Sequence, residues 1–518
     1  MIAQYTLFET HFTSTQPYEN PFWDVDQRVT FTAPSGKQHI IDAYWDGGDV
    51  WRVRFSPDEV GTWSWATSCS DAGNSGLHGQ QGTFECVAYT GDNPLYQHGP
   101  LKVSGDHYSI TYADGTPFFW LADTAWNGVL RASAEDWERY LARRREQGFT
   151  AVQFVSTHWR GLSRDHLGEV AFTGDDRIEL NVAFFQRLDP KMAAINAHGL
   201  VAAPVMLWTL TETDPGQVIS EAAAIRFCRW LQARWGAYQV VWLVGGDGCY
   251  QASGLVEKFQ RIGREVFDDR HDRLATLHPC GQAWIKDEFG RESWFDFIGY
   301  QSGHGDSEEH LRWLTQGPPA HDWQSDPPLP VINIEPNYES HPAYHSKTPF
   351  GAYEVRRASY WSLLLSPAAG VTFGHNAIWV WPPEKPEPAE NHDNIGMVQP
   401  WHTALDTPAL ESMTVLRQFF DALPWWTLHP APEVLVTQPG IKDPRRFIAA
   451  AQTRDGTQTV IYLPEGESVT LYTSKLHQPA RARWFDPRGG GWHPTEITAL
   501  PEQTFVPPDG QDWLLVLG

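Results

Sequence analysis

The sequence predicts an α/β protein in which a (β/α)8 TIM barrel is flanked by two small β-sandwich domains. Three observations predict this fold. Residues 1–95 contain short segments that alternate apolar and polar side chains, as strands do. Residues 96–424 alternate eight apolar runs with helical segments, which is the pattern of a (β/α)8 barrel. Residues 425–518 return to short strands separated by turn clusters.

The first predicted domain, residues 1–95, reads as a β-sandwich. The segment Trp51-Arg52-Val53-Arg54-Phe55 has a period of two, and turn signals stand at residues 34–37 and 46–49. No long helical pattern interrupts these strands. Two packed antiparallel sheets are therefore the expected arrangement.

The middle of the chain, residues 96–424, supplies the barrel. A hairpin that turns at Asp114-Gly115 precedes it. The expected barrel strands are residues 118–122, 150–155, 200–207, 240–244, 274–277, 295–300, 330–334 and 370–373. The expected helices are residues 133–147, 183–198, 221–235, 254–267, 307–315, 354–365 and 408–422. An open doubly wound sheet is the alternative, but it favours a glycine-rich turn after the first strand, and none occurs there.

The last predicted domain, residues 425–518, is a second β-sandwich. Turn clusters at residues 454–456 and 487–491 separate its strands. The expected strands are residues 447–451, 459–463, 469–472, 481–485 and 513–517.

Charge and composition exclude several classes of partner. With 39 Lys and Arg against 63 Asp and Glu, the net charge is −24, which disfavours nucleic-acid binding. No apolar run is long enough to span a membrane, and the first residues do not resemble a signal peptide. The five cysteines show no CxxC spacing, so we expect reduced thiols in a cytoplasmic protein. Pairing of Cys69 with Cys86 is the alternative for an exported chain.

Two carboxylates stand where a barrel places its active site, at the carboxyl ends of the strands. Asp247 follows the fourth predicted strand and Glu335 follows the seventh. These strands lie nearly across the barrel, so the two side chains can face one bond from opposite sides. Glycoside hydrolysis needs such a pair, one carboxylic acid and one carboxylate. A helix-capping role is the competing interpretation for each residue alone, and Glu339 is a second candidate nucleophile.

Other strand-end residues suit the binding of a sugar, because polar groups bond its hydroxyls and Trp rings cover its C–H faces. The 26 Trp residues divide five, sixteen and five among the predicted domains, so most of them are expected to fill cores. The predicted substrate-binding residues are Asp123, Trp126, His158, Trp159, Trp208, His278, Gln301, His304, Tyr338, His375 and Trp379.

We predict no cofactor and no metal ligands. The strand-end histidines are the competing metal site, but the first strand lacks the HxH that metal-dependent barrel hydrolases commonly carry. A serine triad is disfavoured because no GxSxG occurs.

The motifs at residues 119–126, 241–247 and 330–338 resemble the apiosidase-like glycoside hydrolases, family 140 and its relatives. The segment with Trp45-Asp46-Gly47-Gly48 resembles the sandwich that often precedes that barrel, and the tail resembles the sandwich that often follows it. The resemblance implies a retaining mechanism with Asp247 as acid/base and Glu335 as nucleophile. Many related barrels carry Asn-Glu where this chain has Gly246-Asp247, which shortens the acid by one methylene.

The sequence therefore predicts a retaining, exo-acting glycosidase that cleaves short oligosaccharides or glycosides. The alternative is a non-catalytic glycan-binding protein built on a barrel scaffold.

Overall fold

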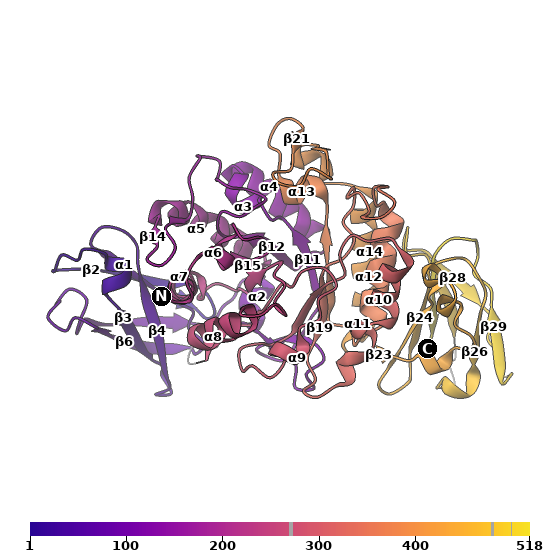
Figure 1. The fold of residues 1–518 in the computed structure, drawn as a ribbon. Helices are drawn as coiled ribbons and strands as arrows, with labels where there is room; N and C mark the ends of the chain where they lie inside the picture. Colours follow the sequence, from indigo (N-terminus) through magenta and orange to yellow (C-terminus); the bar gives the residue numbers. More distant parts are fainter. Residues whose placement is uncertain (269–272, 478–480, 499) are drawn as a thin grey trace.

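The computed structural model describes residues 1–268, 273–477, 481–498 and 500–518. Its three parts lie in a row, with the N-terminal strands at one end, the barrel in the middle and the C-terminal strands at the other end (Figure 1). The predicted fold class is confirmed. Among the described residues, no helix is both long and apolar enough to cross a bilayer.

The seven strands of the N-terminal sandwich join in one sheet, in the order β1-β7-β6-β3-β4-β5-β2, whereas two separate sheets were predicted. Trp51, Val53 and Phe55 are buried, as the period of two predicts. The turn at residues 34–36 is closed by a bond from Ala33 N to Lys37 O of 2.8 Å. The strands are β1 Ile2–Ala3, β2 Phe8–Thr13, β3 Gln27–Thr32, β4 Gln38–Trp45, β5 Val50–Phe55, β6 Gly61–Cys69 and β7 Gln81–Val87, with the short helix α1 Pro21–Asp24 after β2.

All eight barrel strands are parallel and stand in the order β17-β16-β15-β12-β11-β20-β19-β18. Thr276 bridges the two end strands, because its hydroxyl donates to Phe297 O at 2.6 Å. The strands are β11 Trp120–Thr124, β12 Ala151–Val155, β15 Val201–Trp208, β16 Trp242–Gly246, β17 Ala275–Thr276, β18 Ile298–Gln301, β19 Val331–Glu335 and β20 Gly370–Gly374.

Each long predicted helix is present with bounds within two residues of the prediction. Ser133 caps α4, because its hydroxyl accepts from Asp136 N at 3.0 Å. The long helices are α4 Ala134–Glu146, α5 Val182–Ala197, α7 Glu221–Trp235, α8 Leu255–Phe267, α10 Glu308–Gln316, α12 Ala352–Leu364 and α14 Pro408–Asp421. The short helices are α2 Pro94–His98, α3 Gly128–Arg131, α6 Pro215–Val218, α9 Lys286–Phe289, α11 Pro318–His321 and α13 Asn376–Val380.

Small sheets lie outside the barrel wall. The predicted hairpin at Asp114-Gly115 belongs to a three-stranded sheet of β8 Leu101–Val103, β9 Ile110–Tyr112 and β10 Pro117–Phe118. Two further hairpins lie in barrel loops, β13 Phe172–Thr173 with β14 Glu179–Leu180 and β21 Glu387–Pro388 with β22 Met397–Val398. The second hairpin follows α13 and rises above the barrel beside that helix (Figure 1).

The C-terminal sandwich has a six-stranded sheet and a two-stranded sheet. Three strands were not predicted, β23 Leu428–Pro430, β28 Trp492–Thr495 and β29 Glu502–Phe505, because none shows a clear apolar alternation. The large sheet contains β23 Leu428–Pro430, β24 Ala449–Thr453, β25 Thr459–Leu463, β30 Trp513–Leu517, β27 Ala482–Phe485 and β28, and the small one pairs β26 Val469–Tyr472 with β29. A buried bidentate pair between Arg356 of α12 and Asp512 joins this sandwich to the barrel.

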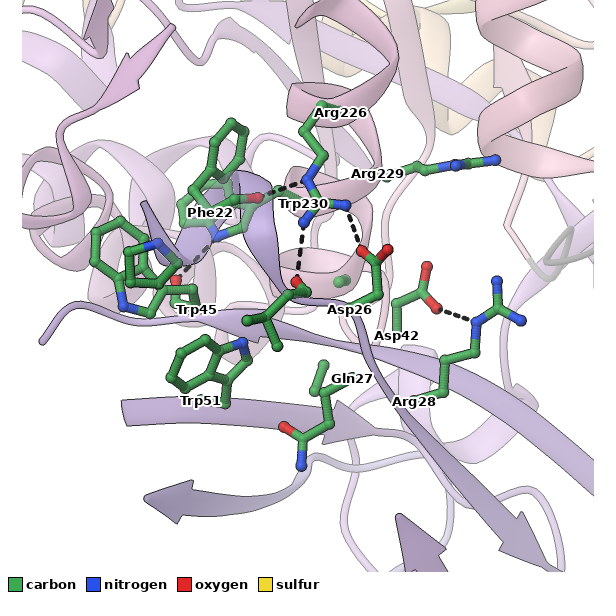
Figure 2. Close-up of a pocket in the computed structure, with 14 residues that line it drawn as sticks. Phe22, Asp26, Gln27, Arg28, Asp42, Trp45, Trp51, Arg226, Arg229 and Trp230 are labelled. Atoms are coloured by element: carbon green, nitrogen blue, oxygen red, sulfur yellow. Dashed lines mark hydrogen bonds and ion pairs between the residues drawn. The ribbon is translucent and has the colours of Figure 1, made fainter. Parts of the chain in front are cut away.

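Helix α7 of the barrel binds the N-terminal sandwich through Arg226 (Figure 2). The guanidinium donates to Phe22 O at 2.6 Å and Val25 O at 2.9 Å, and it pairs with Asp26. One turn on, the indole of Trp230 donates to Trp45 O at 2.9 Å. A cavity of about 550 Å³ lies at this contact, and we call it the seam pocket.

All five cysteines are free. The register of β6 and β7 places Cys86 opposite Gly61, at the far end of a nine-residue strand from Cys69. At about 3.3 Å per residue, that offset separates the two cysteines by about 26 Å. The alternative Cys69–Cys86 disulfide is therefore wrong.

Candidate active site

A second cavity, of about 530 Å³, opens at the carboxyl ends of the barrel strands, and we call it the mouth pocket. It is lined by Trp126, Trp159, Arg160, Trp208, Leu210, Asp247, Gln301, His304, Glu335, Tyr338, His341, Tyr344, Trp379 and His392.

Asp247 enters this pocket from the turn that follows β16. Its backbone is left-handed, with φ of 49°. Gly246 lies directly under the Trp208 ring, and a Cβ there would come within 2.4 Å of the ring. Only glycine fits this position, so the Gly-Gly pair before Asp247 allows the strand end to approach the aromatic wall. A left-handed non-glycine residue persists where surrounding structure fixes it, which is common at functional sites.

The pKa of Asp247 is raised from 3.8 to about 7. Burial is the larger cause, because a charged carboxylate loses its hydration in the pocket, and the negative charge of Glu335 adds to it. His278 and Arg160 oppose the shift. Asp247 can therefore carry a proton near neutral pH.

Glu335 ends β19 and is surrounded by donors. Its Oε1 accepts from Gln301 Nε2 at 2.7 Å and lies 3.0 Å from His304 Nε2. Its Oε2 lies 3.2 Å from His278 Nε2. Burial alone would raise the pKa of Glu335, but His278 and His304 outweigh it and hold the pKa well below its ordinary value. Glu335 is therefore ionised near neutral pH, where Asp247 can carry a proton.

Four tryptophans form an aromatic wall of the pocket. Trp159 lies against Trp208 with ring centroids 4.3 Å apart, and Trp126 meets Trp208 edge-on at 5.4 Å. The Trp159 indole is fixed by a 2.9 Å bond to Asn127, and Trp379 lies 6.3 Å from Trp159. Rings fixed in this way present C–H-binding faces to a sugar without further ordering.

The pocket brings together most of the predicted site residues. Tyr338 contacts the His304 ring at 4.5 Å and donates to the Thr124 hydroxyl at 3.2 Å. His278 lies behind Glu335, against the Trp126 ring at 5.3 Å. The predicted residues that line the pocket are Trp126, Trp159, Trp208, Asp247, Gln301, His304, Glu335, Tyr338 and Trp379.

The prediction that Asp123 binds substrate is wrong. Its side chain is fully buried and accepts from Arg144 Nε at 2.5 Å and from the Tyr140 hydroxyl at 2.7 Å. Both partners come from α4. Asp123 therefore holds this helix against the barrel wall, away from the pocket.

Two predicted histidines also lie outside the pocket lining. His375 caps α13, where its Nδ1 accepts from Ala377 N at 3.0 Å. His158 packs against the Phe172 ring at 5.0 Å, and burial lowers its pKa to about 4. Neither side chain lines the pocket, where both were predicted to lie.

Glu339, the second candidate nucleophile, is occupied elsewhere. Its carboxylate accepts from Ala409 N at 3.3 Å and from the Thr407 hydroxyl. These are groups at the N-terminus of α14, where a carboxylate is stabilising. The structure thus separates Glu339 from Glu335, four residues apart in sequence.

Five lining residues were missed from the sequence. Arg160 directly follows Trp159 and binds His392 Nε2 at 3.1 Å and Asn391 O at 2.8 Å. Most of the missed residues lie farther along the loops that directly follow barrel strands, but His392 comes from a distant loop. The missed residues are Arg160, Leu210, His341, Tyr344 and His392.

The described part of the chain contains no group of three or more His, Cys, Asp or Glu side chains placed to hold a metal ion.

Three family models match successive parts of the chain. Residues 104–427 match "Apiosidase-like, catalytic domain", and residues 1–70 match a domain of unknown function, DUF5060. Residues 430–518 match a family whose description names a collagen-binding domain of a collagenase. None of the curated proteins compared matches the chain.

Solved structures share the fold. A structure titled "Glycoside hydrolase" has a TM-score of 0.71 at 22% identity and covers 83% of this chain and 98% of its own. A family 5 glycoside hydrolase from Bacteroides vulgatus has the same score and identity, covering 83% and 95%. A second Bacteroides vulgatus structure, also titled as a glycoside hydrolase, has a TM-score of 0.75 at 18% identity and covers 100% and 99%.

The match to the catalytic-domain model spans more than half of the chain and includes both pocket carboxylates. The predicted resemblance is confirmed, and the chain belongs to the apiosidase-like family of glycoside hydrolases.

Proposed function

We propose that this protein is a retaining, exo-acting glycosidase that cleaves short oligosaccharides or glycosides, with Glu335 as nucleophile and Asp247 as general acid/base. One observation carries the proposal: two carboxylates share a pocket in which their pKa values move in opposite directions. Such a pair divides into an acid and a nucleophile at neutral pH.

The first step uses both residues at once. Protonated Asp247 donates its proton to the glycosidic oxygen, and the Glu335 carboxylate attacks the anomeric carbon. The bond to the leaving group breaks, and the sugar becomes an ester of Glu335. Gln301 and His304 hold the carboxylate in place through Oε1.

The second step reverses the roles. Asp247, now ionised, removes a proton from water, and the resulting hydroxyl attacks the anomeric carbon. The ester bond breaks, Glu335 is released as a carboxylate and Asp247 is protonated again. Two inversions give a product with the configuration of the substrate.

The pocket lining supports a terminal sugar as the bound group. The side chains come from strand ends on both sides of the barrel, and the Arg160–His392 contact adds a wall from two loops. A cavity enclosed in this way suits the end of a chain better than its middle. We also propose that the domains span residues 1–95, 96–424 and 425–518.

A panel of aryl glycosides that includes pentofuranosides tests the activity. We expect at least one glycoside to be cleaved, and NMR of the first product should show retained anomeric configuration. An inverted product would overturn the retaining mechanism. Binding of glycans without cleavage of any panel member, natural disaccharides included, would instead favour a glycan-binding protein.

A further inference from the structure

Two cysteines lie at the edge of the active site. Cys249 stands two residues after Asp247, and Cys280 stands two residues after His278. Their Sγ atoms are 2.7 Å apart. Cys249 is exposed and Cys280 is half-buried, so a reagent in solution can reach the pair.

The main chain holds the two thiols together. Cys280 N donates to Gly248 O at 3.0 Å, and Gly248 N donates to His278 O at 3.3 Å. These bonds extend the parallel pairing of β16 and β17 into the loops that follow. A disulfide needs an S–S bond of about 2.05 Å, so only a small movement separates the thiols from a bond.

The loops that follow β16 and β17 both carry residues that influence Asp247. The first carries Asp247 in its left-handed conformation, which must be held by its surroundings. The second carries His278, which lies 3.2 Å from Glu335 and opposes the pKa shift of Asp247. A covalent link between the loops would fix the acid relative to the nucleophile.

We propose that Cys249 and Cys280 form a disulfide in oxidising surroundings and that this bond positions Asp247 as the general acid. The positioning role rests on the proposed function of Asp247, whereas formation of the bond does not. In reducing surroundings the pair stays as two thiols, and the acid loop is held by its hydrogen bonds alone.

The reaction is thiol–disulfide exchange with a small-molecule disulfide, for which oxidised glutathione is the probe. The exposed Cys249 thiolate attacks one sulfur of the probe and forms a mixed disulfide, releasing one glutathione thiolate. Cys280, deprotonated as it attacks, displaces the second glutathione thiolate. The protein loses two protons and two electrons, and the probe takes them up to become two thiols.

Intact mass and peptide mapping test the bond. After exposure to oxidised glutathione, the full chain should be lighter by two hydrogen atoms, and one cross-linked peptide should contain both cysteines. Cys69→Ser should behave in the same way, because Cys69 lies on β6 of the N-terminal sandwich. The Cys249→Ser variant should form no such disulfide and should yield no cross-linked peptide. An oxidised wild type with both thiols free would overturn the proposal.

The positioning role is tested with two substrates of one sugar, one with a good leaving group and one with a poor one. Only the poor leaving group needs a proton from Asp247. Reduction of the bond, or Cys249→Ser, should lower kcat/KM, which reports the first step, several-fold on the poor leaving group and leave it nearly unchanged on the good one. An equal fall on both substrates would indicate a merely structural role and overturn the positioning role.

Asp247→Asn separates this inference from the proposed function. If the variant loses activity on the poor leaving group while oxidised and reduced wild type are equal, the positioning role fails and the acid assignment stands. If the variant keeps full activity, the acid assignment fails, while the mass measurement still decides whether the disulfide forms.

Discussion

The seam pocket and the mouth pocket differ in how their charges are balanced. At the seam, Asp26 pairs with Arg226 and Asp42 lies 3.3 Å from Arg28 (Figure 2). At the mouth, the negative charge of Glu335 makes ionisation of Asp247 less favourable. The two pockets therefore differ in their electrostatics.

This difference separates a structural contact from a reactive site. Paired charges such as those at the seam join two surfaces at an interface. Carboxylates that share a pocket with imidazoles and an amide have perturbed pKa values, which indicates a functional site. The comparison predicts that the seam can be altered without loss of catalysis, and that the mouth cannot.

The largest expected effect comes from neutralising carboxylates one at a time, two at the mouth and one at the seam. Asp247→Asn should lower turnover of a poor leaving group by about 10²–10⁴-fold, because proton donation is lost. Glu335→Gln should lower it at least as much, because no nucleophile remains. Asp26→Asn should leave turnover within about twofold of wild type, since that side chain is 68% exposed at the seam. Steady-state kinetics on one substrate checks all three.

Glu339→Gln is the matched control for Glu335→Gln. It makes the same carboxylate-to-amide change four residues later in the sequence. The Glu339 side chain binds the N-terminus of α14 and does not line the mouth pocket. A fully active Glu335→Gln, or an inactive Glu339→Gln with an intact fold, would reverse the assignment of the nucleophile.

The second effect concerns the stability of the seam. Arg226→Met removes the donors to Phe22 O and Val25 O, so we expect a loss of about 2 kcal/mol in the free energy of unfolding. Arg229→Met is the control from the same helix and pocket. Its guanidinium binds Glu265 within the barrel, and the cost should be under about 1 kcal/mol. Denaturant unfolding measures both, and equal losses would contradict a bridging role for Arg226.

Much of this arrangement could be predicted from the sequence because barrel geometry fixes which residues meet. Each apolar run defined a strand, and the side chains that follow strands four and seven meet at the mouth. Asp247 and Glu335 were found for that reason. Gly246 could be recognised as unusual, but its contact with Trp208 depends on the twist of two neighbouring strands.

The sequence could not show which polar side chains are already occupied. Asp123 lies one residue before the end of β11, close to the position that Glu335 has in β19, yet Arg144 and Tyr140 of α4 bind it inside the wall. Helix rotation relative to the strand decides this outcome, and no local pattern records it. His392 was missed for the opposite reason, since a loop far from any strand end carries it to Arg160.

The third effect is the pH dependence of catalysis. For a poor leaving group, kcat/KM should fall as pH rises through about 7, because Asp247 loses the proton that it must donate. The acidic limb should lie below the ordinary pKa of a glutamic acid, since His278 and His304 keep Glu335 ionised. With an activated leaving group, the limb near pH 7 should weaken. A profile flat from pH 5 to 9 on the poor leaving group would contradict the assignment of the acid.

The smallest effect is a gain in stability at the mouth, opposite in sign to the loss at the seam. The folded-state pKa of Asp247, about 7, is above its ordinary 3.8, so the native state binds the proton more tightly than the unfolded chain. Wild-type stability therefore falls as pH rises between these two values. Asn has no charge to desolvate and tolerates a left-handed backbone, so Asp247→Asn should gain on the order of 1 kcal/mol at pH 8 and little at pH 4. Unfolding at both pH values measures this difference, and a variant less stable than wild type at pH 8 would mean that the charge of Asp247 is better solvated than its pKa implies.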